Sequence, residues 1–372
     1  MKVVKVRSPF MIQVNESTQI GSKIELFIWR NGETEPTVPT YTLSKPIPTS
    51  NQRLTSYNVS NFVKEYIENI APTYVNYPVN NETNNNYARF KVKRYWNNAG
   101  VYTLLDTISY VGINGYSDYM DGLQVAEDTR IKLLFNPTIQ NNYQIQTTYS
   151  PNTIQYLNVL VEFLDVDDLF TVTYNRLSGG YSAPVYFDGY TGIYLFKVPI
   201  TLAKVDNNFI KGANISLSYL VDSTGVSTTF NNIYTYPIEE CKYTPVLCDF
   251  INSYGGWQTL TLYKAQTNSV QVKKESYKLM PEAVNYNTLK GQSKSFNHSV
   301  TKSIKINTGF VDENYSQVLT DLLLSETILL DRKPVKIKTE SLELKHVLKD
   351  KLINYELDFQ YAFNIINDVV WF

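Results

Sequence analysis

Cysteine and histidine are nearly absent from this chain of 372 residues, which contains two of each. Cys241 and Cys248 lie in ECKYTPVLCDF without a CxxC spacing, and His298 and His346 lie in separate segments. A structural zinc site needs four such ligands close together, and histidine-based catalysis needs a comparable cluster. The sequence therefore predicts no metal site. We interpret both cysteines as small half-buried side chains in a reducing compartment.

Catalytic motifs are missing as well. The chain has no GxxxxGK phosphate loop, no HExxH and no nucleophile elbow. The run FLDVDDLF brings together Asp165, Asp167 and Asp168, which could bind calcium or act as an acid pair, but it lacks the glycine and the spaced ligands of a calcium loop. A solvated turn between two strands is the favoured interpretation. We therefore expect no enzyme, no catalytic residue and no cofactor.

Charge of one sign and long hydrophobic runs are also missing. Lys and Arg total 34 against 35 Asp and Glu, so no overall basic field exists to attract nucleic acid or an anionic membrane. No segment approaches the roughly 20 apolar residues that span a bilayer. The opening MKVVKVRSPF carries three basic residues within its apolar stretch and resembles a first strand rather than a secretory signal. We expect a soluble protein, used without export, with no sequence-specific nucleic acid partner and no membrane partner.

Aromatic residues are abundant instead. The chain has 30 Tyr, 17 Phe and 4 Trp, with only 19% charged residues, a balance that favours strands and protein contact surfaces. Exposed aromatic side chains beside Asn and Asp can also stack on sugars, and Tyr186, Phe187, Asp188 and Tyr190 in PVYFDGYTGIY fit that description. The composition therefore favours a β-rich protein that binds proteins, with a glycan site as the alternative.

Strand-like runs separated by turn signals predict a β-sandwich domain over residues 1–126. They are VVKV, MIQV, KIELFIW, TYTL, ARFKVKRYW and TLLDTISYVG. One short helix interrupts them, capped by Ser60, with an apolar face made of Phe62, Val63, Tyr66, Ile67 and Ile70. The asparagine-rich residues 79–87 predict a loop that is mobile in the free protein.

Six further runs predict a second β-sandwich domain over residues 127–236. They are RIKLLF, IQYLNVLVEF, LFTVTY, GIYLFKVPI, NISLSYLV and TTFNNIYTY. Residues 237–372 predict a C-terminal β domain, in which two strands flank an NSYGG turn and a helix over 313–325 covers a sheet. Asp312 is the expected cap of that helix, and Tyr315, Val318, Leu319 and Leu322 are its expected buried stripe. The predicted fold class is mainly β: several antiparallel β-sandwich domains and a C-terminal β domain with one covering helix.

The C-terminal run NYELDFQYAF divides into two faces with the period of two that a half-buried strand requires. Its polar face carries Glu356 and Asp358, which we predict to meet solvent or a neighbouring subunit and take as a candidate assembly surface. Its apolar face must be buried, and consists of Tyr355, Leu357, Phe359, Tyr361 and Phe363.

The preceding run PVKIKTESLELK predicts the strand that pairs with this one. Its apolar positions change from odd to even, from Val335 and Ile337 to Leu342 and Leu344. We therefore predict a β-bulge between Lys338 and Ser341. The predicted register pairs Leu344 with Leu357, Leu342 with Phe359 and Ile337 with Phe363, with Asp350 and Lys351 in the turn.

Several stretches together resemble virion tail proteins of Bacteroidetes-infecting tailed phages, especially the crAss-like group. They are VRSPFMIQVNESTQIGSKIELFIWRNG, YTLSKPIP, NGYSDYMDG, DFINSYGGWQTLTLYK, TGFVDENYSQVLTDLLLSETILLDRKPVKIKTESLELK and INYELDFQYAF, which span all three predicted domains. The resemblance implies a structural part of the neck-to-tail assembly and transfers no catalytic position.

The resemblance therefore implies a tail hub that forms a ring around the DNA channel, assembled in the host cytoplasm and located in the virion tail. Its implied partners are copies of itself in a ring and the adjacent tail, neck and fibre proteins. A ring protein of the tail barrel or neck is the nearest alternative. A glycan- or receptor-binding adhesin and a tail-associated depolymerase are further alternatives, of which the depolymerase would need paired carboxylates in a cleft.

Overall fold

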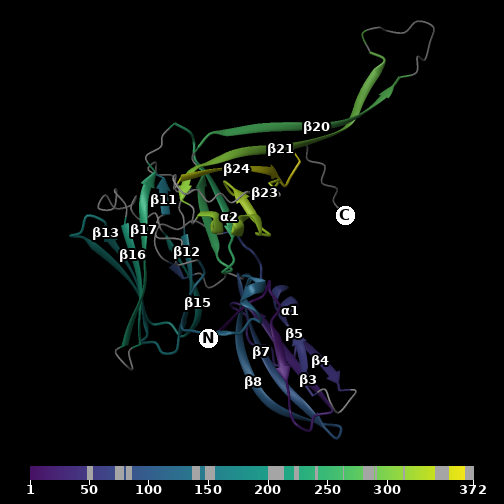
Figure 1. The fold of residues 1–372 in the computed structure, drawn as a ribbon, viewed down its shortest axis with the longest axis vertical. Helices are drawn as coiled ribbons and strands as arrows, with labels where there is room; N and C mark the ends of the chain where they lie inside the picture. The colour runs from purple at the N-terminus through teal and green to yellow at the C-terminus, as the bar shows by residue number, and fades with distance from the viewer. Residues whose placement is uncertain are drawn as a thin grey trace. The chain divides into compact units, whose positions relative to one another are not determined.

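The computed structural model describes residues 1–47, 53–71, 79–80, 86–135, 143–146, 156–199, 213–221, 226–238, 242–262, 264–279, 289, 291–312, 315–339 and 352–364. The chain is mainly β, with several antiparallel sheets, which confirms the predicted fold class (Figure 1). Its contacts divide it into two compact units. Unit 1 comprises Met1–Glu239 and Phe250–Thr259, and unit 2 comprises Glu240–Asp249 and Leu260–Phe372. The domain limits predicted at 126 and 236 stay predictions.

The first sheet of unit 1 has six strands, and most of the predicted N-terminal runs form it. Its order is β4 (Tyr41–Pro46), β3 (Gly21–Arg30), β7 (Tyr87–Asn98), β8 (Val101–Ile113), β1 (Lys2–Lys5) and β9 (Glu127–Asp128). A two-stranded sheet of β2 (Met11–Val14) and β5 (Thr55–Asn58) contributes to the same core. Ile24, Leu26 and Phe90 are fully buried there, as the alternating pattern of β3 and β7 requires.

The short helix α1 (Ser60–Lys64) lies where the sequence predicts a helix, but Ser60 is not its cap. Val59 occupies the N-cap position and makes no side-chain capping bond. The Ser60 hydroxyl instead accepts a hydrogen bond from the Phe10 amide at 2.7 Å and donates one to the Ser8 carbonyl, because it faces the segment that leads into β2 rather than the helix end. On the predicted apolar face, Val63 is buried, whereas Ile70 is 45% exposed and lies beyond the helix.

The prediction of a loop over residues 79–87 is wrong at both ends. Val79–Asn80 forms β6, which pairs with β15, and Tyr87 begins β7 with 1% of its side chain exposed. The Tyr87 hydroxyl donates to the Ile193 carbonyl at 3.0 Å. Tyr87 is therefore fixed by a contact distant in sequence, which the asparagine-rich residues around it do not reveal. Residues 81–85 lie outside the described residues, and their predicted mobility stays a prediction.

The rest of unit 1 is a β-sandwich that contains the six predicted runs and three strands that were not predicted, β6, β11 (Tyr143–Gln146) and β14 (Ser182–Phe187). Its four-stranded sheet has the order β10 (Ile131–Leu133), β12 (Tyr156–Phe163), β15 (Gly192–Pro199) and β6, and its five-stranded sheet has the order β11, β17 (Val226–Ile238), β16 (Ala213–Val221), β13 (Leu169–Arg176) and β14. Both sheets contribute to one core that includes Phe163, Phe170 and Phe196.

The four-stranded sheet is buried on both faces. Leu160 and Leu195 turn away from the sandwich core and pack with Val3 and Tyr87 of the first sheet. A strand buried on both sides has no polar face, which explains why β12 reads as the nearly continuous apolar run YLNVLVEF.

Unit 2 is organised around a seven-stranded sheet. Its order is β19 (Trp257–Leu262), β18 (Val246–Ile251), β22 (Ile328–Leu330), β23 (Lys333–Ile337), β24 (Leu352–Tyr361), β21 (Ser293–Asp312) and β20 (Gln266–Lys278). The tip of the β18–β19 hairpin, Phe250–Thr259, belongs to unit 1. There the buried Asn252 donates to the Leu134 carbonyl at 3.0 Å and accepts from the amides of Tyr254 and Gly256, and these bonds fix the predicted NSYGG turn.

Helix α2 (Tyr315–Leu323) ends two residues before the end of the predicted span of 313–325. Three residues of the predicted stripe, Val318, Leu319 and Leu322, are buried. Asp312 is the last residue of β21 and pairs with Leu352. Residues 313 and 314 lie outside the described residues, so the predicted cap stays a prediction.

The predicted register of the C-terminal hairpin is also wrong. Ile337 pairs with Phe359 and Val335 pairs with Tyr361. The partner of Ile337 on β24 therefore lies four residues before the predicted partner, Phe363. The Lys338 amide donates to the Asp358 carbonyl, and the Thr339 hydroxyl accepts from the Asp358 amide. The predicted bulge between Lys338 and Ser341 extends into residues outside the described ranges and stays a prediction. Residues 340–351, which include Leu342, Leu344 and the predicted turn, lie outside the described residues. Tyr355, Leu357 and Phe359 are buried as predicted, but Phe363 lies beyond the strand and is 44% exposed.

Candidate assembly surfaces

The predicted assembly residues lie on the polar side of β24. Glu356 is exposed and forms an ion pair with Lys305 of the adjacent strand, with 3.3 Å between Nζ and Oε2. Asp358 is half-buried, and its backbone bonds to Lys338 and Thr339. Both side chains alternate with the buried Leu357, so the division into two faces holds over this part of the strand. Their role in assembly stays a prediction.

A second surface, which the sequence analysis missed, is the exposed end of the β20–β21 hairpin. We call Thr267–Lys278 together with Ser293–Lys302 the ribbon. The pairing of β21 with β24 starts at Ser303. Over Ser293–Lys302, β21 pairs only with β20 among the described residues. All of Thr267–Lys278 is exposed, so the ribbon covers no core there (Figure 1). The run QTNSVQVKKESYK alternates only over a few residues, which is why it gave no clear strand signal.

The two faces of the ribbon follow from its register. Val270 pairs with Lys302 and Val272 with Val300, so these side chains share one face, and the alternation of β20 adds Lys274 and Lys278 to it. We call these six residues the valine face. It carries three lysines and no acidic residue. Val270 and Val272 are 57% and 52% exposed.

The opposite face of the ribbon carries an aromatic pair. Tyr277 and Phe296 are 47% and 45% exposed, and their ring centroids lie 5.6 Å apart in an edge-to-face arrangement. The pairing shifts between Lys273 and Glu275, and the left-handed backbone of Asn297 lies at this shift, which marks a β-bulge on β21.

A third surface is the segment Asp118–Asp128 of unit 1, which links β8 to β9. Asp118 and Asp121 form a capping box around the single turn Tyr119–Asp121: the Asp118 carboxylate accepts from the Met120 amide, and that of Asp121 accepts from the Asp118 amide. Four large apolar side chains of the segment, two in this turn and two after it, are exposed. They are Tyr119, Met120, Leu123 and Val125, which are 94%, 86%, 70% and 83% exposed.

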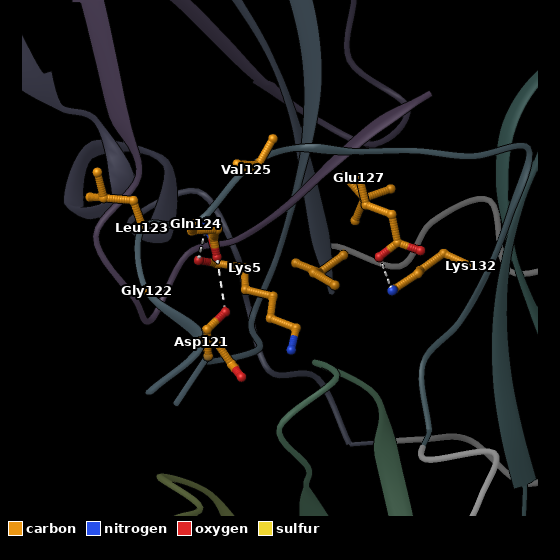
Figure 2. A pocket seen from close by; sticks show the side chains of 11 residues that line it. Lys5, Asp121, Gly122, Leu123, Gln124, Val125, Glu127 and Lys132 are labelled. Carbon is orange, nitrogen blue, oxygen red and sulfur yellow. Dashed lines mark hydrogen bonds and ion pairs between the residues drawn. The ribbon is translucent and has the colours of Figure 1, made fainter. Parts of the chain in front are cut away.

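The inner side of the same segment borders a pocket of about 330 Å³. Lys5 extends into it, whereas Leu123 turns away from Lys5 (Figure 2). Gln124 donates to the Lys5 carbonyl at 3.1 Å, and Lys132 forms an ion pair with Glu127 (Figure 2). Lys5 also donates to the Tyr116 carbonyl. These bonds anchor the segment from within and leave its outer side to solvent.

The acidic run of the sequence analysis is largely a structural turn. Burial alone would raise the pKa of Asp168, but hydrogen bonds from Tyr219 and from the Leu164 and Asp165 amides together hold that pKa below its usual range. Asp168 is 2% exposed, whereas Asp165 and Asp167 are exposed. Within the described part of the chain, no three His, Cys, Asp or Glu side chains are grouped to hold a metal ion.

The aromatic cluster considered for sugar binding does not form one surface. Phe187 is 8% exposed and belongs to the sandwich core, and Tyr190 packs on Phe163 with 5.5 Å between ring centroids. Tyr186 and Asp188 remain exposed. The alternation of β14 separates Tyr186 from Phe187, and the sequence analysis did not recognise this strand.

The histidines and cysteines of the chain form no metal site among the described residues. His298 is exposed on β21, and Cys248 is a buried free thiol whose pKa is raised by burial. His346 and Cys241 lie outside the described residues. No helix within the described ranges is long and apolar enough to cross a membrane.

No known protein-family model matches the chain, and no curated protein matches it. The ribbon and the segment 118–128 are therefore characterised by their own chemistry. A signal for the second of them was present in the sequence, since four large apolar residues stand in a turn punctuated by Gly and Asp without strand or helix periodicity.

Proposed function

We propose that the protein is a structural component of a phage tail that assembles into a ring through repeated contacts between its copies. The resemblance to tail proteins of crAss-like phages is the basis for the tail assignment, with the tail hub as the preferred position and a barrel or neck ring as the alternative. It acts by assembly rather than turnover, with adjacent tail, neck and fibre proteins as further partners.

The observation that carries an assembly role is the ribbon. A two-stranded hairpin is marginally stable alone in water, and this one exposes apolar side chains on both faces over its described length. Large exposed apolar surface on a folded protein marks contact sites. The mainly β architecture and the exposed segment 118–128 support the same proposal.

Sedimentation velocity of the purified chain over a range of concentrations, followed by negative-stain electron microscopy, tests assembly. We expect closed rings with a fixed number of copies. Gold-labelled antibody on phage particles then tests the tail assignment, and we expect label at the tail rather than on the capsid. A chain that stays monomeric at every concentration and binds glycans on an array would overturn the proposal in favour of an adhesin.

A further inference from the structure

The ribbon and the segment 118–128 have complementary chemistry. The valine face combines exposed apolar side chains with Lys274, Lys278 and Lys302. The segment combines exposed apolar side chains with four acidic residues and contains no Lys or Arg. The two surfaces are therefore complementary: both expose apolar side chains, and their charges are of opposite sign.

The charges on both surfaces are available for a partner. Among the described residues, no ion pair involves the three lysines of the valine face or the carboxylates of Asp118 and Asp121. Two other acids of the segment are already used, because Glu127 pairs with Lys132 and Asp128 lies 3.8 Å from the N-terminal amine. Asp118 and Asp121 are thus the acids of the segment that remain for an incoming basic surface.

We propose that the valine face of the ribbon of one copy docks on the segment 118–128 of the next copy. The two surfaces differ, so the contact is heterologous, and each copy both donates a ribbon and receives one. Such a contact closes into a ring when its rotation permits. The inference rests on the proposed function for its occupant, a second copy, and adds the two surfaces through which copies join.

Cross-linking between mixed copies tests this contact directly. One chain carries Val272→Cys and an affinity tag, the other carries Leu123→Cys and no tag, and both carry Cys241→Ser, while the buried Cys248 is retained. Mild oxidation should produce a disulfide-linked dimer of tagged and untagged chains. A matched control replaces Leu123→Cys by Val38→Cys, whose parent side chain is 71% exposed elsewhere in unit 1, and should give only background.

Two results of the cross-linking would overturn the inference. One is a yield with Leu123→Cys no higher than the yield with Val38→Cys. The other is a disulfide that forms only inside a single chain carrying both Val272→Cys and Leu123→Cys and never between mixed chains. That result would mean that the ribbon docks on its own chain.

Charge reversal supplies a second test. Lys274→Glu with Lys278→Glu should lower the cross-linking yield about tenfold, as should Asp118→Lys with Asp121→Lys, because like charges then face each other. A chain with all four reversals should recover the yield. Unchanged yields in the paired reversals, or no recovery in the fourfold reversal, would overturn the inference.

Two controls separate charge from folding. Asp118→Asn with Asp121→Asn keeps side-chain oxygens that can accept the capping hydrogen bonds, and should give an intermediate yield. Asp167→Lys with Asp188→Lys changes two exposed acids away from the segment and should leave the yield unchanged. If the protein forms rings but the charge reversals leave the cross-linking yield unchanged, this inference alone is contradicted. If the specific cross-links form but the protein never closes into rings, the proposed function alone is contradicted.

Discussion

At the scale of single residues, one buried amine shows how the sandwich tolerates a polar group. Lys197 lies on β15, 3% exposed, between Asn158 of β12 and Val79 of β6 in the sheet register. Burial lowers the pKa of Lys197 to about 8 from its ordinary value of 10.5. No ion pair of Lys197 occurs among the described residues, so its charged form costs folding free energy at neutral pH.

The Lys197→Met variant should therefore be more stable than the parent, by an amount that depends on pH. Between about pH 8 and 10.5 the unfolded lysine binds a proton that the folded one has lost, so raising the pH through this window stabilises the parent. We expect the variant to gain about 3 kcal/mol at pH 7 and about 1 kcal/mol at pH 9.5. Urea unfolding at both pH values measures this.

Lys278→Met is the control for Lys197→Met, because Lys278 is exposed on the ribbon and should give no pH-dependent gain. A constant stability difference between the parent and Lys197→Met from pH 7 to 9.5 would contradict the depressed pKa. Groups common to all variants cancel in this comparison, which is why the difference between variants is measured rather than the parent's own pH profile.

At the scale of elements, the bulge between β21 and β24 depends on one hydroxyl. The register shifts between Asn307 and Phe310, which leaves an extra residue on β21. Thr308, 2% exposed, fills the interrupted ladder: its Oγ1 accepts from the Tyr355 amide at 3.0 Å and lies 3.2 Å from the Tyr355 carbonyl. The left-handed backbone of Gly309 then returns the strand to its register.

Thr308→Val should lower the free energy of unfolding by about 1–3 kcal/mol, because it keeps the shape of the side chain but leaves the buried Tyr355 amide without its acceptor. Urea unfolding measures the loss, and hydrogen exchange of a peptide covering β24 should become faster. Thr308→Ser retains the hydroxyl and should stay close to the parent. If Val were as stable as Ser, the hydroxyl would not support the bulge.

The two faces of β24 give a further prediction at this scale. Phe359 is fully buried and pairs with Ile304 and Ile337, so Phe359→Ala should cost about 3–5 kcal/mol as a core truncation. Glu356→Lys with Asp358→Lys should change the thermal midpoint little, because Glu356 is exposed, Asp358 is only half-buried, and surface charges contribute little to folding, yet should weaken ring assembly in sedimentation velocity. Normal assembly of this double variant would remove the polar face from the list of contact surfaces.

The sequence predicted these elements unevenly, for physical reasons. Alternation is a local property, so β3, β7, β12 and the faces of β24 could be read from their own residues. Register is not local: Ile337 pairs with Phe359 rather than Phe363 because both neighbours of β24 must align in one sheet. Exposure is not local either. Val270 and Val272 alternate as buried residues do, and the ribbon could be recognised only once the pairing of β21 was known.

At the scale of the whole molecule, the near-neutral total charge conceals a separation of charge. Lys and Arg number 34 and Asp and Glu 35, but the valine face of the ribbon carries only lysines and the segment 118–128 only acids. A uniform surface of zero net charge would favour non-specific association. Separated patches favour one orientation of contact, which is the requirement for a ring with a fixed number of copies.

The salt dependence of assembly should reveal this separation. The Debye length falls from about 10 Å at 0.1 M to about 3 Å at 1 M salt, so exposed charges on the ribbon and the segment attract less as NaCl rises. We expect the parent's association, followed by sedimentation velocity, to weaken about tenfold or more between about 0.05 and 0.5 M NaCl, as screening removes steering and attraction together.

The chain with Lys274→Glu and Lys278→Glu should associate weakly throughout and should not weaken further, because its reversed face is repelled most at low salt. Ammonium sulfate should preserve more association than NaCl at equal ionic strength, since it strengthens apolar burial. Association of the parent that strengthens steadily with NaCl would mean that the copies join through apolar contact without the charges, and the lysines of the valine face would then have no part in the ring.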